Sequence, residues 1–198
     1  MAMIEDVYES AKEAAHTVRR LREFYRPHDE EERAELGLND LVDGAIDYCR
    51  PRWQEEMRAR GVFIDVVTDL AEIPKVLVSG TEIRELLVNL VMNAVDAIEQ
   101  KGTITIATRE SESGVLLTVA DTGVGMPEDV RKRCLEPFFS TKNAHGTGIG
   151  LSMAYGAVQR HHGRLEIDSA PGTGTTVPEI LCCAVWWGRG RVFFRAII

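Results

Sequence analysis

The sequence predicts an α/β fold, and three observations lead to this prediction. Segments with a helical period of apolar residues alternate along the chain with short apolar runs typical of strands. The segment 81–102 has the length and pattern of a long helix, and it directly precedes two strand patterns. These strands, 103–110 and 115–121, are joined around residues 111–114, which predicts a β-hairpin. The chain has 198 residues, enough to bury a core in one or two domains.

Composition excludes several classes of function. The net charge of −8 would repel a polyanion, so nonspecific nucleic-acid binding is not expected. No apolar run reaches the roughly 18 residues of a membrane span, so this chain is expected to hold no membrane segment, and its acidic N-terminus does not resemble a signal peptide. The cysteines show no CxxC pair and no metal-ligand spacing, which predicts reduced thiols and a cytoplasmic location.

The N-terminal segment, residues 1–27, has the pattern of a heptad helix. Its apolar residues fall at alternating spacings of three and four, at Ile4, Val7, Ala11, Ala14, Val18, Leu21 and Tyr25. A stripe this narrow needs partner helices, from this chain or from another, and predicts part of a dimerisation bundle. Pro27 ends the helix, and residues 28–37 are predicted to be a charged linker.

A second domain is predicted after the linker. Residues 39–61 should form a helix with Asn39 as its N-cap, Gly61 as its end and a kink or interruption at Pro51. Strands are expected at 62–70, 75–79, 103–110, 115–121 and 164–170.

The remaining elements of this domain are two helices and one long loop. The helix at 81–102 should begin with Thr81 as its cap and stop at Gly102. Residues 121–146 show no clean period and are rich in Gly, Pro and charge, which predicts a long loop of the kind that is often functional. A further helix is expected at 148–163.

The long helix carries a polar stripe on an otherwise apolar surface. Glu85, Asn89, Asn93 and Asp96 are spaced by four, four and three residues, which places them within a sector of about 80°. This could be the solvent face of an amphipathic helix, but two asparagines are poor helix formers for such a face. Amide and carboxylate oxygens suit a hard cation such as Mg²⁺, so a functional stripe is favoured.

Three Gly-rich or charged segments follow, each weak evidence alone. In 121–126, DTGVGM, an acid and two glycines follow a strand, as in many ordinary turns. In 146–152, GTGIGLS, bare backbone N–H groups at a helix start could bind an anion or form a hinge; the segment matches neither the Walker A nor the Rossmann pattern. Lys142, in EPFFSTK, is either a phosphate clamp or a surface lysine.

Together and in this order, five motifs resemble the ATP-binding domain of sensor histidine kinases, a branch of the superfamily that includes type II topoisomerases, Hsp90 and MutL. ELLVNLVMNAVDAI resembles the N box, DTGVGM the G1 box, EPFFSTK the F box and GTGIGLS the G2 box, with APGTGTT as the last glycine turn. The resemblance covers residues 38–176. It implies a two-layer α/β sandwich (the Bergerat fold), in which three helices cover a mixed, mostly antiparallel sheet.

The resemblance also implies a role for individual residues. Asn93 resembles the asparagine that holds Mg²⁺ against the phosphates of ATP, with Asn89 beside it. Asp121 resembles the acceptor for the adenine amino group, and Lys142 the lid residue that contacts phosphate. Asn89, Asn93 and Lys142 are the implied catalytic residues. The other implied nucleotide-binding residues are Asp96, Gly123, Gly125, Met126, Gly146, Thr147, Gly148, Gly150, Leu151 and Thr175.

The residue at position 89 separates branches of the superfamily. Branches that hydrolyse ATP carry a glutamate there, which activates water. Asn89 is an amide without a basic lone pair, and Glu85 lies one further turn away. This favours transfer of the phosphoryl group to a protein side chain, in which the domain mainly positions ATP and neutralises its charge.

The chain lacks the acceptor motif that histidine kinases carry on a dimeric helical hairpin. His16 occupies an f position, without a following proline and without room for a returning helix, so it is disfavoured as the acceptor. Residues 13–27 instead resemble the second helix of such a hairpin. The chain is therefore expected to lack the first helix at its front. His161 and His162 should end a helix, where cations suit the dipole.

The last segment, 177–198, departs from the family pattern. Pro178 is expected to interrupt a central strand. The aromatic residues that follow, Trp186, Trp187, Phe193 and Phe194, stand among arginines. An altered reading frame or a docking segment could explain them.

The predicted function is the ATP-binding catalytic domain of a two-component sensor histidine kinase. Its expected cofactors are ATP and Mg²⁺, and its expected partners are a histidine-bearing dimerisation domain, a second copy of the chain and a response regulator. Two alternatives remain: a nucleotide-binding module without kinase activity, and a serine kinase of the anti-sigma type. An ATPase of the topoisomerase or MutL kind is disfavoured by Asn89.

Overall fold

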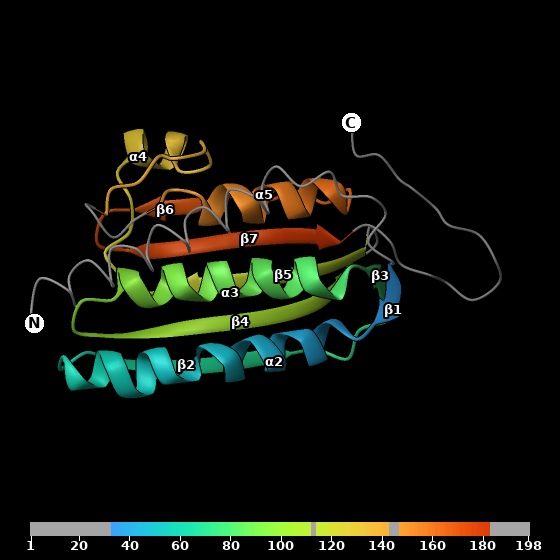
Figure 1. Ribbon diagram of the computed structural model, residues 1–198, viewed down its shortest axis with the longest axis horizontal. Coiled ribbons are helices and arrows are strands. Elements are labelled where there is room, and N and C mark those ends of the chain that lie inside the picture. Colours follow the sequence, from blue (N-terminus) through green and yellow to red (C-terminus); the bar gives the residue numbers. More distant parts are fainter. Residues whose placement is uncertain (1–32, 112–113, 143–146, 183–198) are drawn as a thin grey trace, which may run out of the picture.

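A computed structural model describes residues 33–111, 114–142 and 147–182 of the chain (Figure 1). The predicted heptad helix, residues 28–32 of the linker, Gly146 and residues 183–198 lie outside this part. None of the helices within it is long and apolar enough to cross a membrane.

The main element is a five-stranded sheet with the order β2-β4-β5-β7-β6. The strands are β2 (Phe63–Leu70), β4 (Lys101–Ser111), β5 (Gly114–Asp121), β7 (Gly174–Cys182) and β6 (Asp168–Ala170). β2 and β4 are parallel, and the other three pairs are antiparallel. The mixed, mostly antiparallel sheet and the predicted hairpin are thus confirmed. A second, two-stranded sheet pairs β1 (Ala34–Leu36) with β3 (Val76–Val78).

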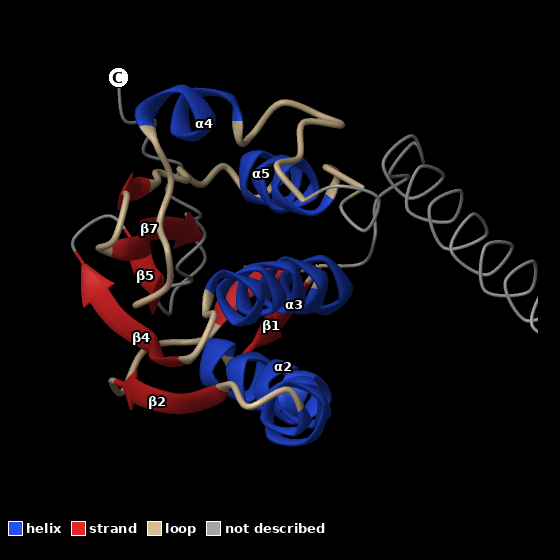
Figure 2. Ribbon diagram, turned by 90° about the vertical axis from the view of Figure 1, so that its left-hand side faces the viewer, coloured by secondary structure: helices blue, strands red, loops and turns tan. Residues whose placement is uncertain are grey.

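Helices form the second layer. Figure 2 shows α2 (Leu38–Pro51), α3 (Gly80–Ala97) and α5 (Gly150–Arg160) on one face of the sheet, which confirms the α/β sandwich. A short helix, α4 (Glu128–Arg133), lies against β6. It falls within the long loop predicted between Asp121 and Gly146, so that loop is not free of secondary structure.

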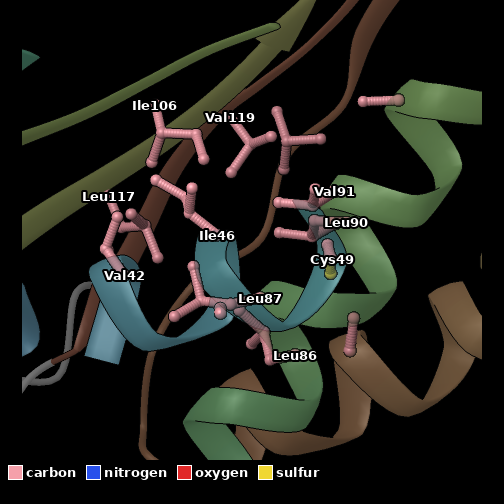
Figure 3. Packing of buried hydrophobic residues seen from close by; sticks show 14 of the residues in the cluster. Val42, Ile46, Cys49, Leu86, Leu87, Leu90, Val91, Ile106, Leu117 and Val119 are labelled. Carbon is pink, nitrogen blue, oxygen red and sulfur yellow. The ribbon is translucent and has the colours of Figure 1, made fainter. Parts of the chain in front are cut away.

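The core lies between α2, α3 and the sheet (Figure 3). Leu86, Leu87 and Val91 of α3 are buried at helical spacings, because one face of the helix meets the sheet while the next meets α2. The labelled partners around them are Val42, Ile46, Cys49, Ile106, Leu117 and Val119. This packing orients α3 so that its polar stripe faces away from the core.

Two predicted helix caps are wrong. The N-cap of α3 is Ser79, whose Oγ accepts a hydrogen bond from the backbone N–H of Glu82 at 3.3 Å; Thr81 already lies within the helix. The N-cap of α2 is Gly37, and the Asn39 side chain instead donates to the Ala71 carbonyl at 2.9 Å. In α3 the hydroxyl of Ser79 takes the capping position, and in α2 the distant partner Ala71 engages the side chain that was expected to cap the helix.

The ends of these helices also differ in part from the prediction. α3 ends at Ala97, and Gly102 lies within β4. Pro51 does interrupt its helix, as predicted: α2 ends there and continues as a π-helical turn, η1 (Arg52–Met57). Proline cannot donate the i→i−4 bond, so the ladder changes its spacing at this point.

Pro178 does not interrupt strand β7. The register between β5 and β7 shifts here, since Val177 pairs with Val119 and Ile180 pairs with Leu117. Two residues of β7 therefore oppose one of β5, as in a β-bulge, where a residue without an N–H is tolerated. On its other side β7 pairs with β6 only at Gly174–Thr176. The sheet therefore continues to Cys182, beyond the predicted boundary at 176.

His161 is a buried structural residue rather than an exposed cation. Its Nε2 accepts from the Ser79 N–H at 3.0 Å, so Nδ1 carries the proton and donates to the Ala157 carbonyl at 2.9 Å. Glu82 Oε2 lies 3.3 Å from Nδ1, and Arg160 pairs with the same carboxylate. Burial lowers the pKa of His161, an effect opposed by the Ala157 bond and by Glu82 and reinforced by the charges of Arg33 and Arg160.

This environment predicts a pH-dependent stability. The pKa of His161 is lower in the folded chain than its ordinary 6.5. At pH values between the folded pKa and 6.5, the unfolded chain therefore binds more protons than the folded chain. The contribution is fully present above pH 6.5 and declines as the pH falls towards the folded pKa. Urea unfolding between pH 7.5 and about 5 measures it. His161→Gln should flatten the slope, and His162→Gln, at an exposed neighbour, should not. Equal slopes in wild type and His161→Gln would refute this role.

Candidate functional site

Asp121 lies at the end of β5, the middle strand of the sheet, and is half-buried. Its Oδ1 accepts the backbone N–H groups of Gly123 at 2.8 Å and Thr175 at 3.2 Å. Burial raises the pKa of this carboxyl, while the two backbone hydrogen bonds lower it. No hydrogen bond to Oδ2 comes from the described residues, so this oxygen is available as an acceptor for a ligand.

The glycines of DTGVGM are required by the protein's own backbone. A Cβ at Gly123 would lie 2.4 Å from the Ala97 carbonyl oxygen, at the end of α3. Gly125 has φ +68°, and a Cβ there would lie 2.0 Å from the Ala170 carbonyl oxygen. Glycine at these two positions lets the segment pass between α3 and the turn after β6, whatever their part in nucleotide binding.

Ser169 holds this segment in place and was not foreseen from the sequence. Its buried Oγ accepts from the Met126 N–H at 2.8 Å and donates to the Gly174 carbonyl at 3.0 Å. The same hydroxyl lies 3.1 Å from Thr175 Oγ1. Thr175 therefore supports Asp121 through its backbone N–H, and its hydroxyl bonds to Ser169. The only sequence signal was the position of Ser169, directly before the last glycine turn.

A second cluster lies on α3, where Lys142 meets the polar stripe. Lys142 Nζ donates to Asp96 Oδ2 at 2.8 Å and lies 3.5 Å from Asn93 Oδ1. The structure therefore brings together three of the predicted site residues, since Lys142 meets Asp96 and Asn93, which lie 46 and 49 residues before it. An amide oxygen, a carboxylate and an ammonium group form a polar surface that suits a metal ion with phosphate oxygens.

Arg52 joins this cluster from η1. Its Nη2 donates to Asp96 Oδ1 at 3.2 Å, so that Asp96 lies between two cations. Arg52 also pairs with Glu56 one turn along its own helix. No motif in the sequence indicates this contact, because Arg52 and Asp96 are 44 residues apart and meet only when α2 packs on α3.

The start of α5 lies beside the same face of α3. A Cβ at Gly150 would lie 3.1 Å from Asn89 Oδ1, so glycine allows this close approach. Gly148 has φ +64°, and its carbonyl accepts from the Phe138 N–H at 2.9 Å. The start of α5 thus contacts both α3 and the segment 138–142, which carries Lys142.

The other predicted site residues occupy varied positions. Thr147 is half-buried before α5, and Leu151 packs partly against the hydrophobic core. The backbone N–H of Met126 donates to Ser169 and so fixes the end of the DTGVGM segment. Gly146 lies outside the described residues. No group of three or more His, Cys, Asp or Glu side chains that could hold a metal occurs in the described part.

Fold and site together define an ATPase-type domain, in which an acid ends the middle strand and a polar cluster lies on the adjoining helix. Residues 79–180, just over half of the chain, match the family described as histidine kinase-, DNA gyrase B-, and HSP90-like ATPase. The chain belongs to this family. Named relatives of the chain, and a solved catalytic domain that it resembles, are histidine kinases, so within this family the chain carries a catalytic ATP-binding domain of the histidine kinase type.

Relatives with known names include sensor kinases from several bacteria. The chain is 44% identical over 93 residues to the sensor histidine kinase ZraS of Klebsiella oxytoca, covering 46% of this chain and 20% of ZraS. It is 31% identical over 163 residues to the signal transduction histidine-protein kinase AtoS of Escherichia coli K12, covering 73% of this chain and 27% of AtoS. The chain thus spans between about a fifth and just over a quarter of the length of these relatives.

Solved structures agree with this assignment. The catalytic domain of histidine kinase ThkA is 28% identical, with a TM-score of 0.64, and the match covers 76% of this chain and 95% of that domain. Full-length ShkA in complex with AMPPNP has a TM-score of 0.77 at 23% identity, covering 93% of this chain and 39% of ShkA. The second likeness supports the fold.

Proposed function

We propose that this chain is the catalytic part of a sensor histidine kinase, which binds ATP and Mg²⁺ and transfers the γ-phosphate to a histidine on a separate hairpin domain. The proposal rests on one observation: Asn93, Asp96 and Lys142 form a cluster on α3, and the half-buried Asp121 lies at the end of β5. The names of the relatives support it, and a structure of ThkA in complex with the response regulator TrrA makes such a regulator the expected final acceptor.

The residues fit a purine nucleotide at one end of the site. Two backbone N–H groups hold Asp121 Oδ1, which directs Oδ2 towards any ligand and keeps the carboxyl in one orientation. In our proposal this oxygen accepts a hydrogen bond from the adenine amino group. A half-buried carboxylate discriminates strongly between donors and acceptors, since a mismatched partner leaves it without a hydrogen bond.

The other end of the site fits phosphates and a hard cation. Bound ATP supplies the phosphoryl group, and Mg²⁺ neutralises its charge. Asn93 Oδ1 is the proposed metal ligand, and Lys142, whose Nζ lies close to that oxygen, is the proposed phosphate contact. Asn89 has no basic lone pair with which to activate water, which favours transfer to a side chain over hydrolysis.

Phosphotransfer to an added hairpin domain tests the proposal. With Mg²⁺ and γ-labelled ATP, we expect acid-labile label on the histidine of the hairpin and little free phosphate. Lys142→Met should reduce the transfer rate by at least about tenfold, since it removes a charge-assisted contact in the transition state. Lys132→Met is the matched control, because Lys132 is an exposed lysine paired with Glu128 on α4. Asn93→Ala should abolish the Mg²⁺-dependent transfer, because it removes the proposed metal ligand.

Other outcomes would contradict the proposal in distinct ways. Label on the chain itself, at His16, would indicate a self-contained kinase. Label on a serine of a protein substrate would indicate a kinase of the anti-sigma type. Rapid release of phosphate without an acceptor would indicate an ATPase, and binding without any transfer would leave a nucleotide-binding module.

A further inference from the structure

Asp96 is the point at which three separate segments of the chain meet. Its Oδ2 accepts from Lys142 Nζ at 2.8 Å and its Oδ1 from Arg52 Nη2 at 3.2 Å. The two cations occupy different oxygens of one carboxylate, and they come from the segment after α4 and from η1. A change in the charge at position 52 therefore changes the net electrostatic potential that Asp96 and Arg52 together create at Lys142.

Arg52 is held more firmly than Lys142. Its side chain is 26% exposed, against 42% for Lys142, and it also pairs with Glu56. Its Nε is buried without a hydrogen-bond partner among the described residues, so the side chain lies against the protein surface and does not extend into water. Arg52 is thus the fixed member of the trio and Lys142 the more accessible one.

The charges indicate what this arrangement does. A carboxylate paired with a single lysine neutralises most of that lysine's charge. Arg52 shares Asp96, so the negative charge of Asp96 is divided between two cations. More of the positive potential of the Lys142 ammonium therefore remains beside Asn93, where a phosphate could meet it.

We propose that Arg52 is a positioning residue for the phosphate end of the nucleotide site, acting on Lys142 through Asp96. The inference rests on the proposed function, since it needs Lys142 to contact phosphate. Arg52 itself contacts Asp96 and Glu56 rather than the nucleotide. It holds the carboxylate in place and prevents it from neutralising the lysine fully.

The substitution Arg52→Gln tests this role. Without the guanidinium, Asp96 should hold Lys142 more tightly and repel phosphate, so the Kd for ATP should rise about fivefold at low salt. The Kd for adenosine, which lacks phosphates, should not change, whereas a merely structural role would weaken both ligands. Added salt should reduce the effect. Arg50→Gln is the matched control, because Arg50 pairs with Asp47 on its own helix.

A double-mutant cycle identifies the route. In the Asp96→Asn background, Arg52→Gln should change the Kd for ATP by less than about twofold, because the carboxylate that transmits the effect is gone. An equal loss in both backgrounds would overturn the inference, and so would an unchanged Kd in Arg52→Gln alone. If the wild-type chain bound no ATP, the proposed function would fail and the inference with it.

A measurement without nucleotide gives an independent readout. The ¹⁵Nζ resonance of Lys142, assigned by its loss in Lys142→Met, reports the environment of the ammonium group. Arg52→Gln should shift it and slow its hydrogen exchange, while Arg50→Gln should leave it unchanged. A resonance that is the same in Arg52→Gln and wild type would show that Arg52 does not act on Lys142.

Discussion

Replacing Asp121 with asparagine should weaken ATP binding by roughly thirtyfold, about 2 kcal/mol, and should shift the preference towards inosine triphosphate. The two backbone N–H groups bonded to Oδ1 require an oxygen at that position. They therefore orient the asparagine so that its Nδ2 replaces Oδ2. A donor then faces the adenine amino group, which is also a donor, and the hydrogen bond is lost.

Inosine triphosphate should show the opposite preference between the wild-type chain and Asp121→Asn. It carries a carbonyl in place of the adenine amino group, so it should bind poorly to the wild-type chain and better to Asp121→Asn. Titrations of both nucleotides with both proteins measure the change. Asp65→Asn, at an exposed carboxylate of β2, is the matched control. If Asp121→Asn keeps the wild-type ratio of the two affinities, Asp121 does not read the base.

The second large effect concerns folding. Gly125→Ala should reduce the free energy of unfolding by about 3 kcal/mol or more. At φ +68° an L-residue costs about 1 kcal/mol, and the new Cβ would lie 2.0 Å from the Ala170 carbonyl oxygen. Relieving that contact moves the segment away from β6 and strains two hydrogen bonds, from Met126 N–H to Ser169 and from Gly172 N–H to Val124.

A matched glycine separates the cost of the backbone conformation from the cost of the close contact. Gly172 has a similar φ of +77°, but a Cβ there would meet nothing within 4 Å. Gly172→Ala should therefore cost only the backbone term, about 1 kcal/mol. Urea unfolding of both variants gives the difference. Equal losses would mean that the close approach to Ala170 has no effect, and Gly125 would then be needed only for its conformation.

Most of the fold could be predicted from the sequence, because local patterns survive in the folded chain. The hairpin, the apolar spacing on α3 and the interruption at Pro51 depend on residues close together in the chain. The predictions failed where a distant partner intervened. Asn39 bonds to Ala71 instead of capping its helix, and Pro178 is accommodated by a bulge that only the pairing with β5 creates.

The same division holds for the site. The order of the motifs indicated Asn93, Asp121 and Lys142, because each residue type suits its chemistry wherever the chain places it. No motif indicated Arg52, and Ser169 had only its position before the last glycine turn: a serine and an arginine are common residues, and their contacts give them a role.

By itself, the sequence determined the family, most of the element types and the chemical character of the proposed nucleotide site, since these depend on residue type and short-range spacing. The tertiary structure alone decided why the glycines of DTGVGM are needed, which tautomer His161 adopts and how Asp96 is shared between Arg52 and Lys142. Each of these depends on atoms that are distant in the chain and within about 3 Å in space, a distance that no sequence pattern encodes.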